Sequence, residues 1–277
     1  MKHIAVLAAA LAMALLPSYP VFATNPKSAV TSTAADKQSA AGIDTFWARA
    51  VKETYKSPEE LKAQHEREVR KGVRYLKLIR GSPRSPEIAL TFDDGPHPDY
   101  TPKILEILKR YNVKATFFIV GKVAEQQPDL VRSELADGHV LGNHTYHHVN
   151  LTKIPVNDIA AEWQACEDVV KQETGVTMRY GRPPGGDYDR DVITAATDLG
   201  LTTVLWTDDP GDYASPGSKV IKSRVLKHVE NGGIILLHDG VQETIDVLPQ
   251  IIETLHARGF RFVTIPELSG EVGASRR

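Results

Sequence analysis

The sequence predicts an α/β protein built on a parallel β-sheet, because short apolar runs alternate with amphipathic stretches from residue 87 onward. Seven runs have the length and composition of strands: 88–92, 115–120, 139–142, 178–181, 202–206, 234–237 and 261–264. Six stretches between them have helical spacing: 102–111 with Thr101 as cap, 128–137, 157–174, 190–199, 218–230 and 244–258. Strands and helices that alternate in this way form right-handed crossovers. Periodicity alone does not separate an open doubly wound sheet from a barrel.

The composition is that of one large globular domain with an appendage. The chain has 277 residues and a net charge of −2, so it lacks the basic excess typical of nucleic-acid binding. Its single cysteine excludes an internal disulfide. Cys166 lies in a helical stretch with no base partner near it in sequence, which favours a buried, inert thiol over a nucleophile.

The N-terminus has the pattern of a cleaved secretory signal peptide over residues 1–23. Lys2 precedes an apolar run over residues 4–16, and Ala23 ends a small-residue cleavage site. A retained anchor is the alternative, but the run is shorter than the about 20 residues of a membrane span. We therefore expect a secreted or periplasmic protein, cleaved after Ala23, with no stable membrane span afterwards.

Three further segments flank the predicted domain. Residues 24–41 are rich in Ser, Thr and Ala and should form a flexible leader. Residues 42–72 predict a helical extension of two helices, one of which starts at the Ser57-Pro58-Glu59-Glu60 signal. The main domain should span residues 73–268, beginning with a strand over 73–79, and 269–277 form a tail.

Two adjacent carboxylates, Asp93 and Asp94, follow the first buried run and precede Gly95-Pro96. Successive side chains of a regular strand point to opposite faces, so both can share one site only where the chain leaves the sheet. The Gly-Pro pair predicts that exit. A surface hairpin turn is the alternative.

His144 and His148 stand four residues apart, a spacing that brings two imidazoles together on a helix or in a tight loop. An Asp and two His form a plausible ligand set for a catalytic zinc ion, with further positions left for water and substrate. Polar residues follow the predicted strands at five places: Asp93 with Asp94, His144, Arg182, Asp209 and His238. Because carboxyl ends of parallel strands share one face, these residues predict an active site.

The chain resembles the polysaccharide deacetylase family, also called the NodB-homology or carbohydrate esterase 4 domain. Five motifs occur in the family's order: residues 91–96, His144 to His148 with Leu151, residues 182–185, residues 206–212 and residues 236–238. The resemblance implies a distorted, incomplete (β/α) barrel of about seven parallel strands, with the helical extension outside it.

The resemblance also implies roles for the site residues. Asp94, His144 and His148 would hold one divalent metal ion, Zn²⁺ in the first place, with Co²⁺, Ni²⁺ or Mn²⁺ as alternatives. Asp93 would be the general base, paired with Arg182. His238 would be the general acid, oriented by Asp209. His147 would be a neighbour of the site and not a ligand.

The chain departs from the family pattern at two positions. Gly185 follows Pro184 where the family commonly has Tyr, and Tyr213 stands where Trp is common. Any residue except Pro keeps the backbone N–H of an oxyanion donor, so Gly185 would retain that donor while an aromatic wall is lost. Pro184, Gly185 and Tyr213 are thus the expected substrate-binding positions.

The expected activity is the metal-dependent removal of acetyl groups from N-acetylated sugars of a glycan. The substrate would be peptidoglycan, a chitin-like polymer or an exopolysaccharide. An acetyl xylan esterase of the same family is the first alternative. A non-catalytic glycan-binding protein on this fold is the second, although binding alone needs no base, acid or base-orienting arginine.

Overall fold

The computed structural model describes residues 54–271. The predicted signal peptide, the flexible leader and residues 42–53 of the helical extension lie outside the described part, as do residues 272–277 of the tail.

Eight strands among the described residues form one sheet, and every pairing within it is parallel. Seven follow the order β1-β6-β5-β4-β3-β2-β7, and β8 pairs with the start of β2. The strands are β1 (Lys77–Leu78), β2 (Glu87–Gly95), β3 (Thr116–Ile119), β4 (Val140–Asn143), β5 (Tyr180–Gly181), β6 (Thr202–Val204), β7 (Gly233–His238) and β8 (Arg261–Phe262). The predicted parallel sheet is confirmed.

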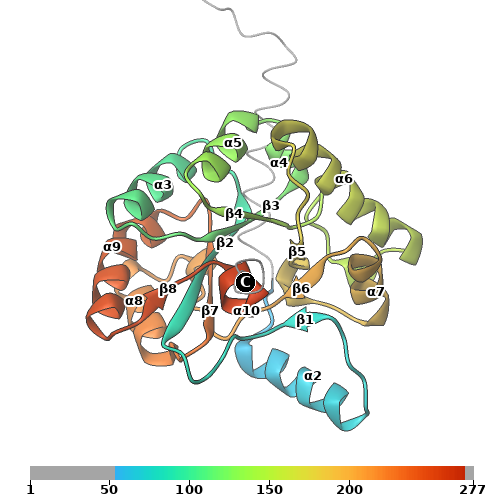
Figure 1. Cartoon of the computed structure of the whole chain (residues 1–277), viewed down its shortest axis with the longest axis horizontal. Coiled ribbons are helices and arrows are strands. Elements are labelled where there is room, and N and C mark those ends of the chain that lie inside the picture. The colour runs from blue at the N-terminus through green and yellow to red at the C-terminus, as the bar shows by residue number, and fades with distance from the viewer. Residues whose placement is uncertain (1–53, 272–277) are drawn as a thin grey trace, which may run out of the picture.

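The sheet curls into a half-barrel that does not close (Figure 1). The path ends at β1 and β7, and one isolated bridge joins Asp208, which follows β6, to Ile235 of β7. Helices surround the curled sheet: α3 (Thr101–Arg110), α4 (Gly121–Ala124), α5 (Pro128–Ala136), α6 (Val156–Thr174), α7 (Arg190–Asp198), α8 (Ser218–His228), α9 (Gln242–Ala257) and α10 (Ile265–Ser269). The expected distorted, incomplete barrel is therefore confirmed.

The core lies on both faces of the central strands. All six residues of β7 are buried, as are all but the first of the nine residues of β2. One face of each strand points into the half-barrel and the other packs on helices, which explains why these strands appear in the sequence as continuous apolar runs. Two buried strands with polar residues at their carboxyl ends thus provide a rigid base for a site.

Helix α2 (Pro58–Arg70) lies outside the ring of helices, beside β1 (Figure 1). Its predicted start is confirmed by a capping box, in which the Ser57 hydroxyl accepts from the Glu60 N–H and the Glu60 carboxylate accepts from the Ser57 N–H. Leu61 on this helix is fully buried. The helix is therefore docked on the domain by an apolar contact.

Several element boundaries differ from the sequence prediction. Only Lys77 and Leu78 of the predicted strand over 73–79 pair in the sheet. The predicted cap Thr101 lies inside α3, whose N-cap residue is Tyr100. The Thr101 hydroxyl does not cap the helix but donates to the buried carboxylate of Asp239. The short helices α4 and α10 were not predicted.

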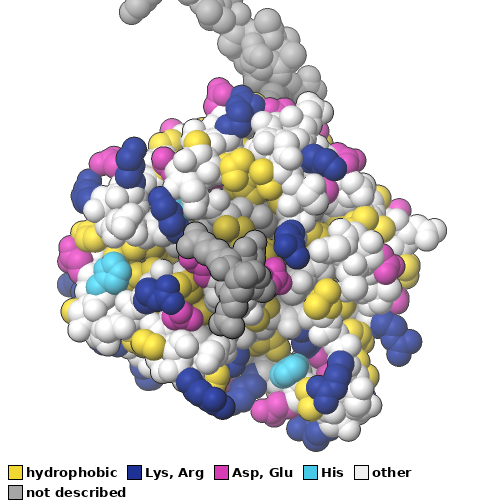
Figure 2. All heavy atoms as spheres, in the orientation of Figure 1, with side chains coloured by type: hydrophobic (Ala, Val, Ile, Leu, Met, Phe, Trp, Pro, Cys, Tyr) yellow, Lys and Arg dark blue, Asp and Glu magenta, His cyan; other side chains and the backbone are white. Residues whose placement is uncertain are grey.

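Charged side chains are spread over the surface. Figure 2 shows Lys and Arg interspersed with Asp and Glu on the face that it draws, so that face carries no large patch of a single sign. Within residues 54–271, no helix has the length and apolar character needed to cross a membrane.

Candidate active site and metal centre

Asp93 and Asp94 reach the same site although strand β2 continues through both of them to Gly95. The prediction that they lie in a loop beyond the strand is wrong. The pairing of β2 with β3 instead shifts register between Phe92 and Gly95, and Asp94 has a φ of 73°. This irregularity turns both carboxylates toward His144, whose Nε2 lies 3.6 Å from Asp93 Oδ2 and 3.5 Å from Asp94 Oδ1.

A tight loop after β4 places the two imidazoles. The Asn143 side-chain oxygen accepts from the Thr145 N–H at 2.9 Å, and the Thr145 hydroxyl accepts from the His148 N–H at 3.2 Å. Both Thr145 and His148 have positive φ, at 67° and 55°. Side-chain hydrogen bonds therefore hold this loop in a conformation that few residues adopt unaided.

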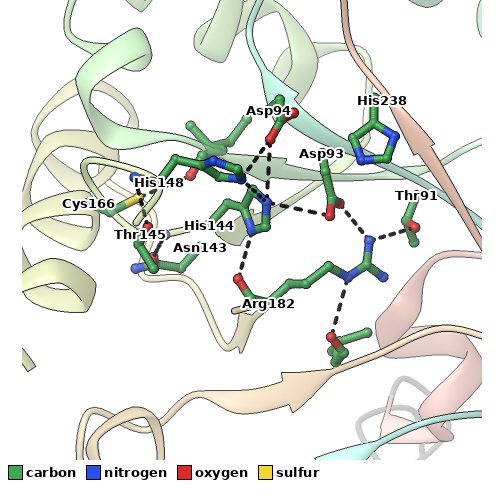
Figure 3. Close-up of polar contacts among 12 residues, drawn as sticks. Thr91, Asp93, Asp94, Asn143, His144, Thr145, His148, Cys166, Arg182 and His238 are labelled. Atoms are coloured by element: carbon green, nitrogen blue, oxygen red, sulfur yellow. Dashed lines mark hydrogen bonds and ion pairs between the residues drawn. The ribbon is translucent and has the colours of Figure 1, made fainter. Parts of the chain in front are cut away.

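The donor atoms of Asp94, His144 and His148 lie within 4.8 Å of one another, and all three residues are buried (Figure 3). His148 Nε2 is 3.0 Å from Asp94 Oδ1 and 3.1 Å from His144 Nε2. His144 donates its Nδ1–H to the Arg182 carbonyl oxygen at 2.7 Å, which leaves the lone pair of Nε2 directed into the cluster. These predicted ligands are brought together.

The cluster fits one divalent metal ion. Asp94 Oδ1 is buried, and apart from the imidazole nitrogens of His148 at 3.0 Å and His144 at 3.5 Å it has no hydrogen-bond partner, an arrangement that favours binding of a cation. Burial opposes ionisation of Asp94, but the neighbouring imidazoles of His148 and His144 hold the pKa of its carboxyl well below the usual range. An ionised carboxylate with two imidazoles is a donor set that zinc and similar ions bind.

His147 points away from the cluster. Its side chain is half exposed, and its Nδ1 lies 2.7 Å from a carboxylate oxygen of Glu162. This contact agrees with the expectation that His147 is a neighbour of the site.

Arg182 holds Asp93, as predicted. Its guanidinium is buried and donates to Asp93 Oδ1 at 2.6 Å and to the Thr91 hydroxyl at 2.9 Å. The guanidinium carbon lies 4.1 Å from the centre of the Phe118 ring, a stacked cation–π contact. Asp93 Oδ2 is left buried without a hydrogen-bond partner, on the side that faces His144. One oxygen of Asp93 is thus fixed while the other can accept a proton.

His238 is oriented by Asp212, and the prediction that Asp209 does this is wrong. The imidazole donates Nδ1–H to Asp212 Oδ1 at 2.7 Å, and the backbone N–H of His238 donates to Asp212 Oδ2 at 2.9 Å. Thr244 holds Asp212 Oδ2 by a further hydrogen bond of 2.7 Å. Asp209 instead accepts from the Gly211 N–H at 2.8 Å, so its carboxylate closes the turn before Asp212.

The pKa of His238 reflects this partner. Burial alone would lower it, but the Asp212 carboxylate, with smaller contributions from Asp94 and Asp93, outweighs burial and raises the pKa to about 9. His238 Nε2 is buried without a hydrogen-bond partner. The side chain is therefore a cation at neutral pH whose second N–H has no acceptor among the described residues.

The remaining predicted positions lie in two short 3₁₀ turns, Pro184–Gly186 and Asp212–Ala214. The Tyr213 ring lies 5.3 Å from the His238 ring, edge to face. Pro184 and Gly185 are buried in the turn after Arg182, and Gly185 has a φ of 65°. The Gly185 carbonyl accepts from the Lys56 N–H at 2.9 Å, so this turn contacts the segment that precedes α2.

Sequence reasoning missed three residues that support the site. Thr91 lies in the motif over residues 91–96 and Thr244 in a predicted helix, but the sequence does not reveal the role of either, because each acts through one hydroxyl whose partner is known only from the fold. Tyr55 precedes every motif, and it lies against His238 with the ring centres 4.9 Å apart. Cys166 behaves as predicted: it is buried, its thiol donates to the Ile119 carbonyl, and burial raises its pKa.

The fold and the site define a hydrolase-like half-barrel with an Asp-His-His cluster at the carboxyl ends of its strands. The sequence profile described as polysaccharide deacetylase matches residues 80–204. A peptidoglycan-N-acetylglucosamine deacetylase of Bacillus cereus is 37% identical over 199 residues, which cover 70% of this chain and 72% of that protein. A chitooligosaccharide deacetylase of Sinorhizobium fredii is 35% identical over 213 residues, 70% of this chain and 99% of that protein. The chain belongs to the polysaccharide deacetylase family.

Solved structures agree with this assignment. A peptidoglycan N-acetylglucosamine deacetylase superposes with a TM-score of 0.70 at 36% identity, over 73% of this chain and 95% of that one. A carbohydrate esterase 4 pseudoenzyme from Bacillus anthracis superposes with a TM-score of 0.68 at 29% identity, over 72% of this chain and 70% of that one. The family fold therefore occurs with and without activity, and turnover must be argued from the site.

Proposed function

We propose that this chain removes acetyl groups from N-acetylated sugars of a glycan, with one divalent metal ion, Asp93 as general base and His238 as general acid. The observation that carries the proposal is the pair of buried, unpartnered atoms Asp93 Oδ2 and His238 Nε2 beside the Asp-His-His cluster. Asp93 and His238 are direct partners in the pairing of β2 with β7, so both come from one edge of the sheet. A protein that only binds glycans needs neither group.

Asp94, His144 and His148 would hold the metal ion, which would polarise the acetyl carbonyl and ease deprotonation of the attacking water. Asp93 Oδ2 would accept the proton of that water, while Arg182 holds the other carboxylate oxygen in place. His238 would give its Nε2 proton to the departing amine, and Asp212 would stabilise the imidazolium before that step. The amide C–N bond breaks, a C–O bond to the water oxygen forms, and acetate and a free amine result.

The proposal also includes the identity of the metal ion and the donor to the oxyanion. Zn²⁺ is the first candidate ion because it favours nitrogen and carboxylate ligands with an open position, with Co²⁺, Ni²⁺ and Mn²⁺ as alternatives. The backbone N–H of Gly185 would donate to the oxyanion.

The relatives, which are named for peptidoglycan and chitooligosaccharides, support an N-acetylated glycan as the substrate class. Acetyl esters of xylan are the second candidate. Acetate release should be measured on N-acetylglucosamine oligomers, peptidoglycan fragments, an N-acetylated exopolysaccharide and acetylated xylan, with and without a chelator. We expect release from an N-acetylated glycan that stops with chelator and returns with Zn²⁺. Faster release from acetylated xylan would favour the esterase.

The adjacent carboxylates provide a matched pair of variants. Asp94→Asn should lose metal and activity together, because it removes an anionic ligand. Asp93→Asn should retain about one ion per chain and lose turnover by about 100-fold or more. Metal analysis of the purified variants decides the assignment. A metal-free Asp93→Asn beside a metal-loaded Asp94→Asn would invert the two roles.

We further propose that the chain is exported, with residues 1–23 as a signal peptide cleaved after Ala23. The charged start, the short apolar run and the small residue at position 23 support this proposal. The mass of the protein recovered from the periplasm or medium of an expressing bacterium tests it. Recovery of the uncleaved mass from the membrane fraction would indicate a retained anchor.

A further inference from the structure

The segment Thr54–Lys56, ahead of α2, lies at the candidate active site although it precedes all the motifs in sequence. The Tyr55 ring contacts the His238 ring edge to face, with centres 4.9 Å apart. It also stacks on the Tyr213 ring, with centres 4.2 Å apart and a tilt of 34°. Tyr55 is 7% exposed, so its ring is enclosed by these contacts and their neighbours.

The segment is fixed at both its backbone and its side chains. The Lys56 N–H donates to the Gly185 carbonyl at 2.9 Å, and Lys56 Nζ lies 3.2 Å from Asp187 Oδ1. Helix α2 begins two residues after Lys56, and its Gln64 donates to the Tyr188 carbonyl at 3.2 Å. The turn after Arg182 and the N-terminal segment therefore support each other.

Segment Thr54–Lys56 lies so close to Gly185 that only glycine fits at this position. A Cβ atom at this position would lie 2.9 Å from the Thr54 carbonyl oxygen, closer than a side chain tolerates. Its φ of 65° is a second reason for glycine. Position 185 thus has no room for a side chain while the Thr54 carbonyl is in place.

We propose that Tyr55 is a positioning residue for glycan specificity: stacked on Tyr213 and against His238, it supports the half-buried Tyr213 ring as the aromatic wall of the sugar subsite. This proposal rests on the proposed function, because it assigns the acetylated sugar to the space next to the general acid. Aromatic rings present a rigid apolar face with little entropy to lose, which suits the apolar face of a sugar ring. A wall that touches the sugar but not the acetyl group affects binding of the glycan more than the chemical step.

The test compares two substrates: the pentamer of β-1,4-linked N-acetylglucosamine and p-nitrophenyl acetate. Tyr55→Ala should raise KM for the pentamer about tenfold, while kcat/KM for the small ester changes less than about threefold. Tyr55→Phe should restore KM, because the ring is kept. Tyr75→Ala is the control, since Tyr75 lies in the same part of the chain but contacts Lys77. Thermal unfolding and metal content must match the wild-type protein.

Three outcomes would overturn the proposal. An equal loss on both substrates would mean that Tyr55 acts at the reaction centre or on folding. An unchanged KM for the pentamer would remove Tyr55 from the subsite. Faster pentamer hydrolysis by Tyr55→Ala would mean that the segment blocks the site.

A binding measurement separates this proposal from the proposed function. Calorimetry of the pentamer with Asp93→Asn, and with Asp93→Asn combined with Tyr55→Ala, needs no turnover. About tenfold weaker binding without Tyr55 supports the wall even if the wild-type protein releases no acetate, in which case the proposed function alone fails. Equal affinity, or no affinity in either protein, overturns the wall whatever the activity.

Discussion

The proton on His238 depends chiefly on one residue, Asp212, with smaller contributions from Asp94 and Asp93. A carboxylate 2.7 Å from Nδ1 raises the pKa of the imidazole to about 9 against the effect of burial. Because this pKa lies above the ordinary 6.5, protonated His238 stabilises the fold fully below about pH 6.5, and the contribution is lost as the pH rises through about 9. The alkaline limb of the activity profile should reflect the same group.

Asp212→Asn should therefore move the alkaline limb of kcat to lower pH, because burial is then opposed only by the smaller effects of Asp94 and Asp93 on the pKa of His238. It should also lower kcat by about 100-fold. Asp209→Asn is the matched control and should leave the limb in place, since Asp209 binds the Gly211 N–H. A limb that moves in Asp209→Asn and not in Asp212→Asn would restore the original assignment.

Two constraints act on Gly185: its positive φ and its contact with Thr54. Substitution of Gly175, which has a positive φ but no such contact, measures the effect of the backbone conformation alone. Gly175 has a φ of 74° at the end of α6, and no atom of a neighbouring group lies within 4 Å of the position that a Cβ atom would take. Gly175→Ala should cost about 1 kcal/mol of unfolding free energy for the left-handed backbone alone. Gly185→Ala should cost more, up to about 3 kcal/mol, because the contact is added. Denaturant unfolding measures both. Equal costs would mean that the segment moves aside freely.

Asp212 and Tyr55 show which features of the site the sequence alone does not predict. The motif over 206–212 contains both Asp209 and Asp212, and its spacing cannot say which carboxylate reaches His238. Which carboxylate reaches His238 depends on a turn in which Gly211 has a φ of 69° and donates its N–H to Asp209. The ligand residues were predictable because each follows an apolar strand and parallel strands end at one face. Tyr55 was not, because its contacts come from outside that repeating pattern.

The element that places the imidazoles is the loop after β4, and Asn143 holds it. Its side-chain oxygen accepts from Thr145, and its amide donates to the Trp163 carbonyl of α6 at 2.8 Å. Strand, loop and helix are thus joined by one buried amide. The strand boundary itself was predicted within one residue, since the apolar run ends there, whereas the positive φ of Thr145 and His148 has no sequence signature.

Asn143→Ala should lower metal affinity by about 10- to 100-fold, because the ligand loop loses its support while all three ligands remain. Competition with a chromogenic chelator measures the affinity. Asn231→Ala is the control, since Asn231 precedes the amino end of β7 and its side chain bonds the Pro83 carbonyl. Unchanged affinity in Asn143→Ala would show that the backbone alone fixes the loop.

For the whole molecule, we expect the functional unit to begin ahead of the predicted domain start at residue 73. The segment before α2 contacts Gly185 and His238, so a domain that starts at residue 73 leaves out contacts with the candidate site. The helical spacing of charged and apolar residues predicted helices within 42–72. Such spacing does not indicate which surface of the domain a helix covers.

A pair of truncations tests this boundary. A chain that starts at residue 42 should keep glycan hydrolysis, because the Ser/Thr/Ala-rich leader buries too little apolar surface to contribute. A chain that starts at residue 57 should bind metal but hydrolyse the pentamer at least about tenfold less efficiently, because it lacks Tyr55 and Lys56. Full pentamer activity in the shorter chain would show that the catalytic unit is complete without the segment.

The register that pairs Asp93 with His238 also affects the order in which the protein folds. Asp93, the proposed base, lies on an early strand and His238, the proposed acid, on a late one, and β3, β4, β5 and β6 are made between them. Pairing across such a sequence separation is slow compared with the formation of local helices. A chain still emerging, or one refolding from denaturant, would hold its ligands before it gains a proton donor. Enzyme activity would therefore return after helical structure and metal binding, as one of the last events of folding.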